Sequence, residues 1–425
     1  MLSKEWMIYG ANGYTGRLLV RLAKKRGLQP ILAGRSQEVE TLAKEYHLKS
    51  KIFSIDDVSH IASHITEVSL VVNCAGPFSK TAEKMMRACL KTNSHYIDIT
   101  GEISIFELAN KLDNEALNSN IVLCPGVGSD VIPTDCLAAY LKDKLPDATH
   151  LKMAWATKGS KSSKGTAKTA VEGMGKGGKI RENGKMKKVP LAYKTLDVDF
   201  GYGPQNTMTI PWADVYTAYH STGISNIEFY FARPLHTIKK LQKFRWLFSL
   251  VRFKWINGLL KKRIDKTWKP STDEERARSM SYFWGEVSNE KKEKVVARFT
   301  TADGYDVTAW GAIHVAEHLL TDHNQKGFYT PSLIWENLDI FIYSVIAAII
   351  AIIFVRIQAK KLRENVGKHL PVLNISIAIL FVLPLLTFLF GGVNVGYETP
   401  ELKQLAKTSF KFEGGLSIPP ELLSL

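Results

Sequence analysis

Three glycines at regular spacing, Gly10, Gly13 and Gly16, follow the first apolar stretch of the chain. Glycines let such a turn bend sharply and approach a pyrophosphate, and the N-terminus of the following helix attracts the anion. The spacing is GxxGxxG, but a strand-like run precedes it and an amphipathic helical pattern follows, which strengthens the signal. An ordinary glycine-rich turn is the alternative. We therefore predict a dinucleotide site formed by Gly10, Ala11, Asn12, Gly13, Tyr14, Thr15 and Gly16.

The residues after the second apolar run indicate which dinucleotide binds. NAD sites usually place an acidic residue there, which accepts hydrogen bonds from the ribose hydroxyls. This chain has Gly34, Arg35 and Ser36 instead. A guanidinium and a hydroxyl suit a 2′-phosphate, so the pattern predicts NADP(H), with a solvated arginine as the alternative. Asp56 or Asp57 follows the third run, where either could reach the adenine or cap the next helix.

Small residues follow the fourth apolar run. In a doubly wound sheet the ligand crevice lies outside the carboxyl ends of the strands. We therefore expect this stretch to line the ribose and nicotinamide side of the cofactor. Cys74 is predicted to be a small buried residue and not a nucleophile, because no basic residue adjoins it. The stretch comprises Asn73, Cys74, Ala75, Gly76 and Pro77.

Four polar residues lie where the fifth and sixth apolar runs end, and they are the candidates for substrate positioning or proton transfer: Asp98, Glu102, Ser129 and Asp130. Each has a structural alternative, because such side chains also cap helices and bind backbone amides. The sequence does not choose the catalytic residue among them.

One short motif suggests a metal. His314, Glu317 and His318 match the HxxEH pattern of one class of zinc enzymes. A third ligand is needed downstream, and the chain soon becomes apolar there. We therefore predict no metal site.

The elements that must position these residues fall into segments. Up to about residue 148, short apolar runs alternate with helical patterns, which predicts a Rossmann-type doubly wound parallel sheet in an α/β domain. From 149 to 302 the pattern is of alternating strands, which predicts a second α+β domain with an antiparallel sheet and a hairpin turn at Asn183-Gly184. Residues 303–336 are predicted to form a helix that returns to the first domain, 337–395 a hydrophobic helical hairpin and 396–425 a tail.

The net charge of +15 is unevenly distributed. Ten basic and two acidic residues lie between Lys158 and Lys188, in sequence typical of a mobile loop. Nine basic residues and no acidic one lie between Lys239 and Arg263, interleaved with apolar residues at helical spacing. This second cluster predicts a basic amphipathic helix, either at an anionic membrane or packed on the core with a solvated face. No nucleic-acid-binding signature is present.

Two apolar runs, Ile340–Val355 and Ile375–Val393, predict membrane association. The loop between them is basic, which favours the cytoplasmic side. A hairpin that enters and leaves one face of the bilayer would keep both this loop and the cofactor domain in the cytoplasm.

Seven separated blocks together resemble the saccharopine dehydrogenase-like oxidoreductase family, in particular its branch of trans-acting enoyl reductases. The blocks are GANGYTGRL, LAGRS, VVNCAGPF, HYIDITGE, PGVGSDVIPTD, GTAKTAVEGMGKGG and IPWADVYTAYHSTGI. The resemblance covers about residues 5–335 and departs from the family pattern after Trp335. It implies a Rossmann domain joined to an α+β domain, dinucleotide binding by Gly10, Gly13, Gly16 and Arg35, and NADP(H)-dependent reduction. It identifies no catalytic residue.

These expectations favour an NADP(H)-dependent reductase, membrane-associated with a cytoplasmic catalytic domain, that acts on a lipid-like double bond or carbonyl. The alternatives are a saccharopine or amino-acid dehydrogenase and a non-enzymatic NADPH-binding membrane protein. The partners expected are a lipid-like small molecule and a membrane, with no nucleic acid, and a homodimer is compatible with the sequence.

Overall fold

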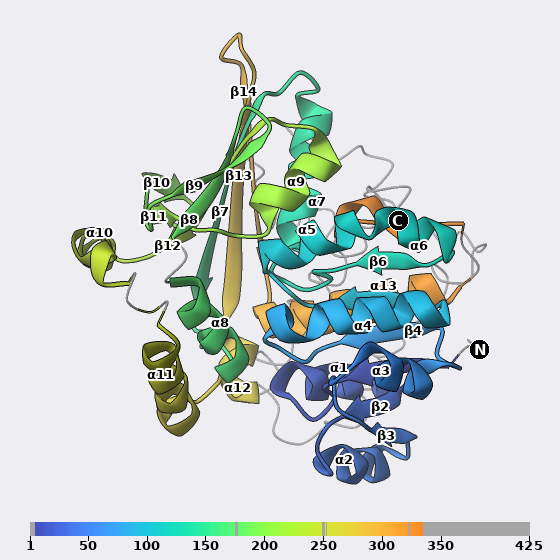
Figure 1. The fold of residues 1–425 in the computed structure, drawn as a ribbon. Coiled ribbons are helices and arrows are strands. Elements are labelled where there is room, and N and C mark those ends of the chain that lie inside the picture. The colour runs from blue at the N-terminus through green and yellow to red at the C-terminus, as the bar shows by residue number, and fades with distance from the viewer. Residues whose placement is uncertain (1–4, 175–176, 249–250, 252, 322–323, 335–425) are drawn as a thin grey trace, which may run out of the picture. The chain divides into compact units, whose positions relative to one another are not determined.

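The computed structural model describes residues 5–174, 177–248, 251, 253–321 and 324–334, all within one compact unit that spans Met1–Leu338. Its first sheet is parallel throughout, with the strand order β15-β6-β5-β4-β1-β2-β3 (Figure 1). Strands β1 to β6, in the spatial order 3-2-1-4-5-6, make a Rossmann fold, as predicted. The strands are β1 (Trp6–Tyr9), β2 (Ile31–Gly34), β3 (Ser50–Ile52), β4 (Leu70–Asn73), β5 (His95–Asp98), β6 (Val122–Cys124) and β15 (Gly327–Phe328).

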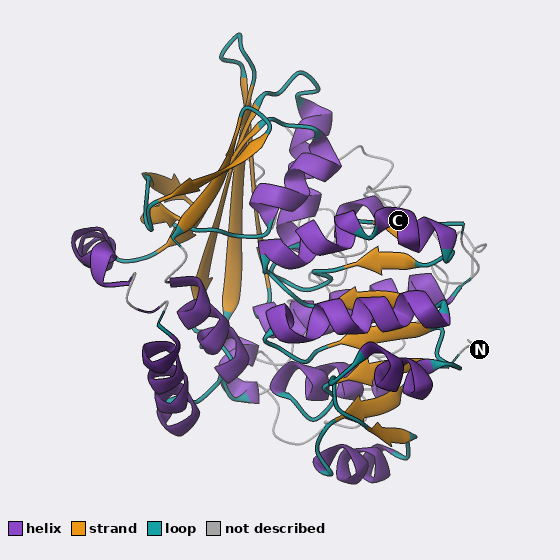
Figure 2. Ribbon diagram, in the orientation of Figure 1, coloured by secondary structure: helices purple, strands orange, loops and turns teal. Residues whose placement is uncertain are grey.

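Helices cover both faces of this sheet (Figure 2). Strands β1, β2 and β4 are buried along their whole length, which is why they read as unbroken apolar runs. On one face α3 packs beside α4, and on the other α1 packs against α13. The helices are α1 (Tyr14–Lys25), α2 (Glu38–Tyr46), α3 (Val58–Ile65), α4 (Phe78–Thr92), α5 (Ile103–Lys111), α6 (Asp113–Asn118), α7 (Ile132–Lys144) and α13 (Gly304–Leu320).

The second sheet has the main order β10-β11-β12-β7-β13-β14, with the β8–β9 hairpin attached to β12. Leu137 and Leu141 of α7 pack on one face, with Phe229 and Phe283 from the strands in the same cluster. Its strands are β7 (His150–Lys158), β8 (Gly178–Glu182), β9 (Lys185–Val189), β10 (Thr195–Asp199), β11 (Pro204–Thr209), β12 (Asn226–Ala232), β13 (Met280–Ser288) and β14 (Lys294–Thr301). Its helices are α8 (Lys164–Met174), α9 (Asp214–Thr222), α10 (Leu235–Phe248), α11 (Lys254–Thr267) and α12 (Asp273–Arg278), and a 3-10 turn, Pro331–Ile334, follows later.

The prediction of an antiparallel second sheet was wrong in one respect. The sheet is mixed, because β12 pairs with β7 in parallel, with Ile227 opposite Leu151. An alternating pattern shows which side chains are buried, but the strand direction depends on how the chain returns. Here more than sixty residues separate the two strands, enough for the crossover. The hairpin turn was predicted correctly: Asn183 and Gly184 have φ of 49° and 75°.

The two basic clusters are also more ordered than the sequence indicated. The supposed loop between Lys158 and Lys188 contains α8 and the β8–β9 hairpin, so that prediction was wrong. Contacts with a distant segment stabilise α8, because Lys168 and Glu172 pair with Asp265 and Lys261 of α11. The second cluster forms two helices, α10 and α11, instead of one.

The predicted hydrophobic hairpin at 337–395 lies outside the described residues. Among the helices that the structure does describe, none combines the length and apolar character needed to cross a bilayer.

Candidate functional site

The glycine turn connects β1 to α1 at the carboxyl edge of the parallel sheet. The amides of Gly10 and Ala11 both donate to the carbonyl of Ala33, at 2.8 and 3.2 Å, which ties the turn to β2. Helix α1 then begins at Tyr14, and no side chain caps it. The first amides of the helix are therefore available to an anion, with the positive end of the helix dipole behind them.

Two of the three glycines are required by the geometry. Gly10 has φ of +81°, and a Cβ there would lie 3.0 Å from the amide nitrogen of Ala75. A Cβ on Gly16 would lie 2.2 Å from the carbonyl oxygen of Gly10. The turn is thus packed backbone against backbone. Without a side chain at these positions, a pyrophosphate can approach the backbone as closely as it needs. The residues present fit a dinucleotide.

Arg35 immediately follows β2 at the same edge of the sheet. Its side chain is exposed, and within the described part of the chain it makes no ion pair or hydrogen bond. It lies close enough to Tyr9 to act on the pKa of that phenol, which burial raises to about 12. The neighbouring Ser36 hydroxyl accepts from the amide of Glu38 at 3.3 Å, at the start of α2. A cation that has no partner among the described residues, beside the glycine turn, suits a 2′-phosphate.

The stretch after β4 is held by Asn73, which is fully buried. Its Oδ1 accepts from the amide of Ala75 at 3.0 Å, and its Nδ2 donates to the Tyr96 hydroxyl at 3.2 Å. Asn73 therefore fixes the backbone that follows β4 from the buried side. Cys74 is half-buried, so the prediction of a buried residue was wrong in degree. Desolvation raises the pKa of its thiol, which disfavours the reactive thiolate.

Three of the four catalytic candidates are engaged in structural contacts. Asp98 is fully buried and accepts from the amides of Thr100 and Gly126, at 3.0 and 2.9 Å, while burial raises its pKa to about 6. Glu102 accepts from the amide of Phe78 at 3.1 Å, where α4 begins.

Ser129 is likewise tied to α13. Its amide donates to the hydroxyl of Thr308 at 3.0 Å, and that hydroxyl donates to Ser129 Oγ at 3.1 Å. These hydrogen bonds hold the ends of β5 and β6 in place. The contacts of Asp98, Glu102 and Ser129 are therefore structural.

Asp130 is different. Its carboxylate makes no hydrogen bond or ion pair with any residue that the structure describes, and the residue stays partly exposed. It faces Gly101, where an added Cβ would lie 3.1 Å from Asp130 Oδ2. Burial of the carboxyl raises its pKa from 3.8 to about 7. A group with this pKa holds or releases a proton at neutral pH, which is what general acid catalysis requires.

Loops and helices that follow the Rossmann strands in the chain supply contacts that local sequence patterns did not indicate. The indole of Trp212 donates to the carbonyl of Asp130 at 2.6 Å, so the loop carrying Asp130 is anchored from beyond the Rossmann domain. Tyr14 of the glycine turn donates to the carbonyl of Ser271 at 2.9 Å and accepts from Arg276 at 3.2 Å. The ring of Tyr14 also meets Tyr305 edge-on, with centroids 4.9 Å apart. The block IPWAD, which contains Trp212, was the one available signal.

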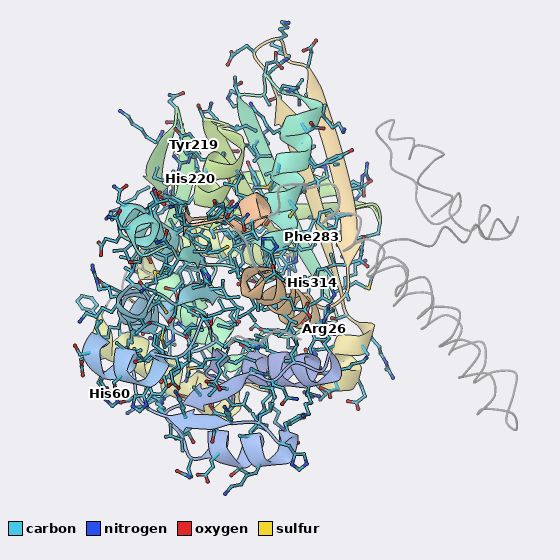
Figure 3. The ribbon with its side chains drawn as sticks, turned by 90° about the vertical axis from the view of Figure 1, so that its right-hand side faces the viewer. Arg26, His60, Tyr219, His220, Phe283 and His314 are labelled. Carbon is cyan, nitrogen blue, oxygen red and sulfur yellow. The ribbon has the colours of Figure 1, made fainter. Side chains whose placement is uncertain are left out.

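The HxxEH residues lie on α13 and face other partners. Glu317 pairs with Arg26 of α1 at 2.8 Å, and Figure 3 labels Arg26 and His314 at this contact between the helices. His318 Nε2 is 2.8 Å from Gln325 Oε1. Burial lowers the pKa of His314 to about 4. Within the described ranges, no three His, Cys, Asp or Glu side chains are grouped as metal ligands.

Residues 6–123 match the family described as the saccharopine dehydrogenase NADP binding domain. The chain is similar to saccharopine dehydrogenase-like oxidoreductases of Bos taurus and Homo sapiens, at 27% and 26% identity over 214 aligned positions. These alignments cover 44% of this chain and 50% of each relative, so the similarity spans about half the length of these relatives. A lipid droplet localized protein of Caenorhabditis elegans is 26% identical over 156 positions, covering 32% of this chain and 35% of that protein.

The fold has a solved counterpart. Apo saccharopine dehydrogenase (L-Glu forming) of Saccharomyces cerevisiae superposes with a TM-score of 0.54, covering 78% of this chain and 95% of that one. The identity is 11%, so this likeness concerns the fold.

Proposed function

We propose that this protein reduces a double bond or carbonyl of a lipid or lipid-linked substrate at a membrane. The premise is that the chain belongs to the saccharopine dehydrogenase-like oxidoreductases and binds NADP(H). The observation that carries the proposal is the Asp130 carboxyl, which lies beside Gly101 at the carboxyl edge of the cofactor-binding sheet. A protonatable group at that edge is what a hydride-transfer site needs in addition to the cofactor.

Bound NADPH supplies the hydride. In the protonated form, Asp130 donates a proton to the atom that becomes negative, which is the oxygen of a carbonyl or the α-carbon of an enoyl group. The substrate thus gains two hydrogen atoms, one as hydride and one as the proton. Asp130 is left ionised and takes up a proton from solvent, which its partial exposure allows.

The environment of Asp130 favours an uncharged reacting group. Asp98 and Glu102 lie on the same strand exit, and the charge of Glu102 adds to the rise in the pKa of Asp98. Of the two, Glu102 is partly exposed, and a dicarboxylate amino acid would meet its charge unfavourably. An apolar acyl or carbonyl compound would not, which ranks an amino-acid dehydrogenase below a lipid reductase. The Caenorhabditis elegans relative is named for its location at lipid droplets, and that location supports a lipid surface as the place of action.

The test is an assay of the 425-residue protein with NADPH and a bacterial or yeast lipid extract. NADPH oxidation is followed by absorbance, and the products are analysed by mass spectrometry. We expect oxidation that depends on the extract, together with lipids that have gained two hydrogen atoms. Turnover of saccharopine with NADP⁺ instead would establish the amino-acid dehydrogenase. Tight NADPH binding without oxidation by any extract would establish a non-enzymatic protein.

Asp130→Asn provides the matched control for this assay. It removes the proton donor but keeps the size of the side chain and the anchoring of the backbone carbonyl by Trp212. We expect NADPH to bind as before and turnover to fall. Unchanged turnover would exclude Asp130 as the acid.

A further inference from the structure

Helices α10 and α11 expose a dense set of large apolar side chains. Of the eleven large hydrophobic residues that are exposed in the described part of the chain, seven lie between residues 244 and 268. Trp255, Trp246 and Leu259 are 72%, 65% and 64% exposed. Phe244, Leu247, Phe253 and Trp268 complete the set, which we call the aromatic-basic face. Soluble monomers rarely concentrate exposed apolar side chains in this way, and such concentrations are typical of binding surfaces.

The opposite sides of both helices are already occupied by the protein. Ile238 of α10 is fully buried, and Gln242 donates to the carbonyl of Ala192 at 3.0 Å. On α11, Lys261 pairs with Glu172 of α8. Trp268 of the aromatic-basic face, just beyond the helix, is held at one edge, because its indole donates to the carbonyl of Ser162 at 2.6 Å while the residue stays 39% exposed. Each helix is therefore attached along one side. The exposed apolar side chains belong to the surface that remains. Figure 1 shows α8 beside α11.

The charge around this face identifies the kind of partner. The segment from Lys239 to Arg263 has nine basic residues and no acidic one. A second copy of the same face would bring these cations against each other, so self-association is disfavoured. Single-stranded nucleic acid would suit the cations and the aromatic rings, but it offers nothing to Leu247 and Leu259. A surface that is anionic outside and apolar within matches all of these side chains.

We propose that the aromatic-basic face docks on an anionic phospholipid surface. Tryptophan and phenylalanine insert at the level of the headgroups, the leucines reach the acyl boundary, and the lysines and arginines bind the phosphates. This arrangement extends the membrane part of the proposed function and gives it a location in the fold. The docking itself requires no turnover, so binding and catalysis can succeed or fail separately.

The first experiment reports on the face directly. Trp255→Cys carries an environment-sensitive fluorescent label, and Ile52→Cys on β3, which is 39% exposed, carries the same label as a matched control. The four native cysteines are buried or half-buried. With phosphatidylcholine vesicles that contain phosphatidylglycerol, we expect a blue shift at position 255 and none at position 52. The shift should be lost in high salt and with pure phosphatidylcholine.

The second experiment measures binding of the 425-residue protein by co-sedimentation with the same vesicles. The double variant Trp246→Ala, Trp255→Ala should bind about tenfold more weakly or worse, because two interfacial anchors are lost. The control Ile52→Ala, Tyr193→Ala removes two exposed apolar side chains elsewhere and should bind as the parent does.

Three results would overturn the proposal. The first is sedimentation of the protein with vesicles although the label at 255 shows no blue shift and the double variant binds as the parent does. Residues 339–425 would then account for binding. The second is a blue shift of the label at 255 without vesicles. A shift independent of protein concentration would assign the face to residues 339–425, and one that increases with protein concentration would assign it to a second copy. The third is a response to a single-stranded oligonucleotide and not to vesicles.

Discussion

Arg35 provides the sharpest test of the cofactor site. The residue is exposed at the end of β2 and makes no ion pair or hydrogen bond with the described residues, so its removal should cost little stability. Its predicted partner is the 2′-phosphate, which NADPH has and NADH lacks. Arg35→Ala should therefore weaken NADPH binding and leave NADH binding unchanged.

The size of the effect follows from the exposure of the side chain. A hydrogen bond to a charged group is worth about 1.5–3 kcal/mol. Because solvent and salt screen an exposed guanidinium, we expect about 1.5 kcal/mol, which is roughly a tenfold increase in the Kd for NADPH. Arg35→Lys should lie between the parent and the alanine variant, since it keeps the charge but not the planar pair of donors.

The assay is a fluorescence titration with NADPH and with NADH at low and high salt. The difference between parent and Arg35→Ala should shrink as salt increases. Arg87→Ala is the matched control, because Arg87 is a surface residue of α4 that pairs with Glu83 at 3.1 Å. Equal weakening of both cofactors by Arg35→Ala would refute the phosphate role, and so would an unchanged Kd for NADPH.

Three further variants test the turn and the acid. Asp130→Asn should lower reductive turnover about 10²- to 10⁴-fold, and in the parent kcat should fall as pH rises through about 7, where the acid ionises. The pKa of Asp130 is about 7 in the folded protein against an ordinary 3.8, so the folded state binds more protons between these pH values and its stability falls as pH rises. Thermal melts should show Asp130→Asn more stable than the parent above pH 7 and similar to it below pH 4. Gly16→Ala should abolish NADPH binding and lower the free energy of unfolding by about 1–3 kcal/mol, because the added Cβ meets the Gly10 carbonyl. Gly173→Ala in α8 is the control: its Cβ meets open space, so it should be neutral or stabilising in urea unfolding. Tyr14→Phe should cost about 1 kcal/mol in the same measurement, since it loses the bond to Ser271 while Arg276 keeps Asp306, and a larger loss of NADPH affinity than of stability would contradict this anchoring role.

Much of the cofactor domain could be predicted from the sequence because its signals are local. Buried parallel strands appear as short apolar runs, and the turn at Gly10 needs residues that tolerate its backbone geometry. Arg35 follows directly after a strand that the apolar run of residues 30–33 already indicated. The hairpin at Asn183-Gly184 was equally readable, since few residue pairs adopt positive φ in sequence.

The tertiary structure decided what depends on distant partners. Asp98, Glu102, Ser129 and Asp130 look alike as polar residues after strands, and only the folded chain shows that three of them are engaged and that Asp130 is not. The carboxyl of Asp130 lacks a partner among the described residues, while Trp212 binds its carbonyl. The direction of β12 beside β7 likewise depends on the path of the intervening chain. The order of α8 depends on ion pairs with α11, about a hundred residues away. Periodicity determines which element forms and which side is buried, whereas pKa shifts, strand direction and exposed faces are set by residues that meet only after folding.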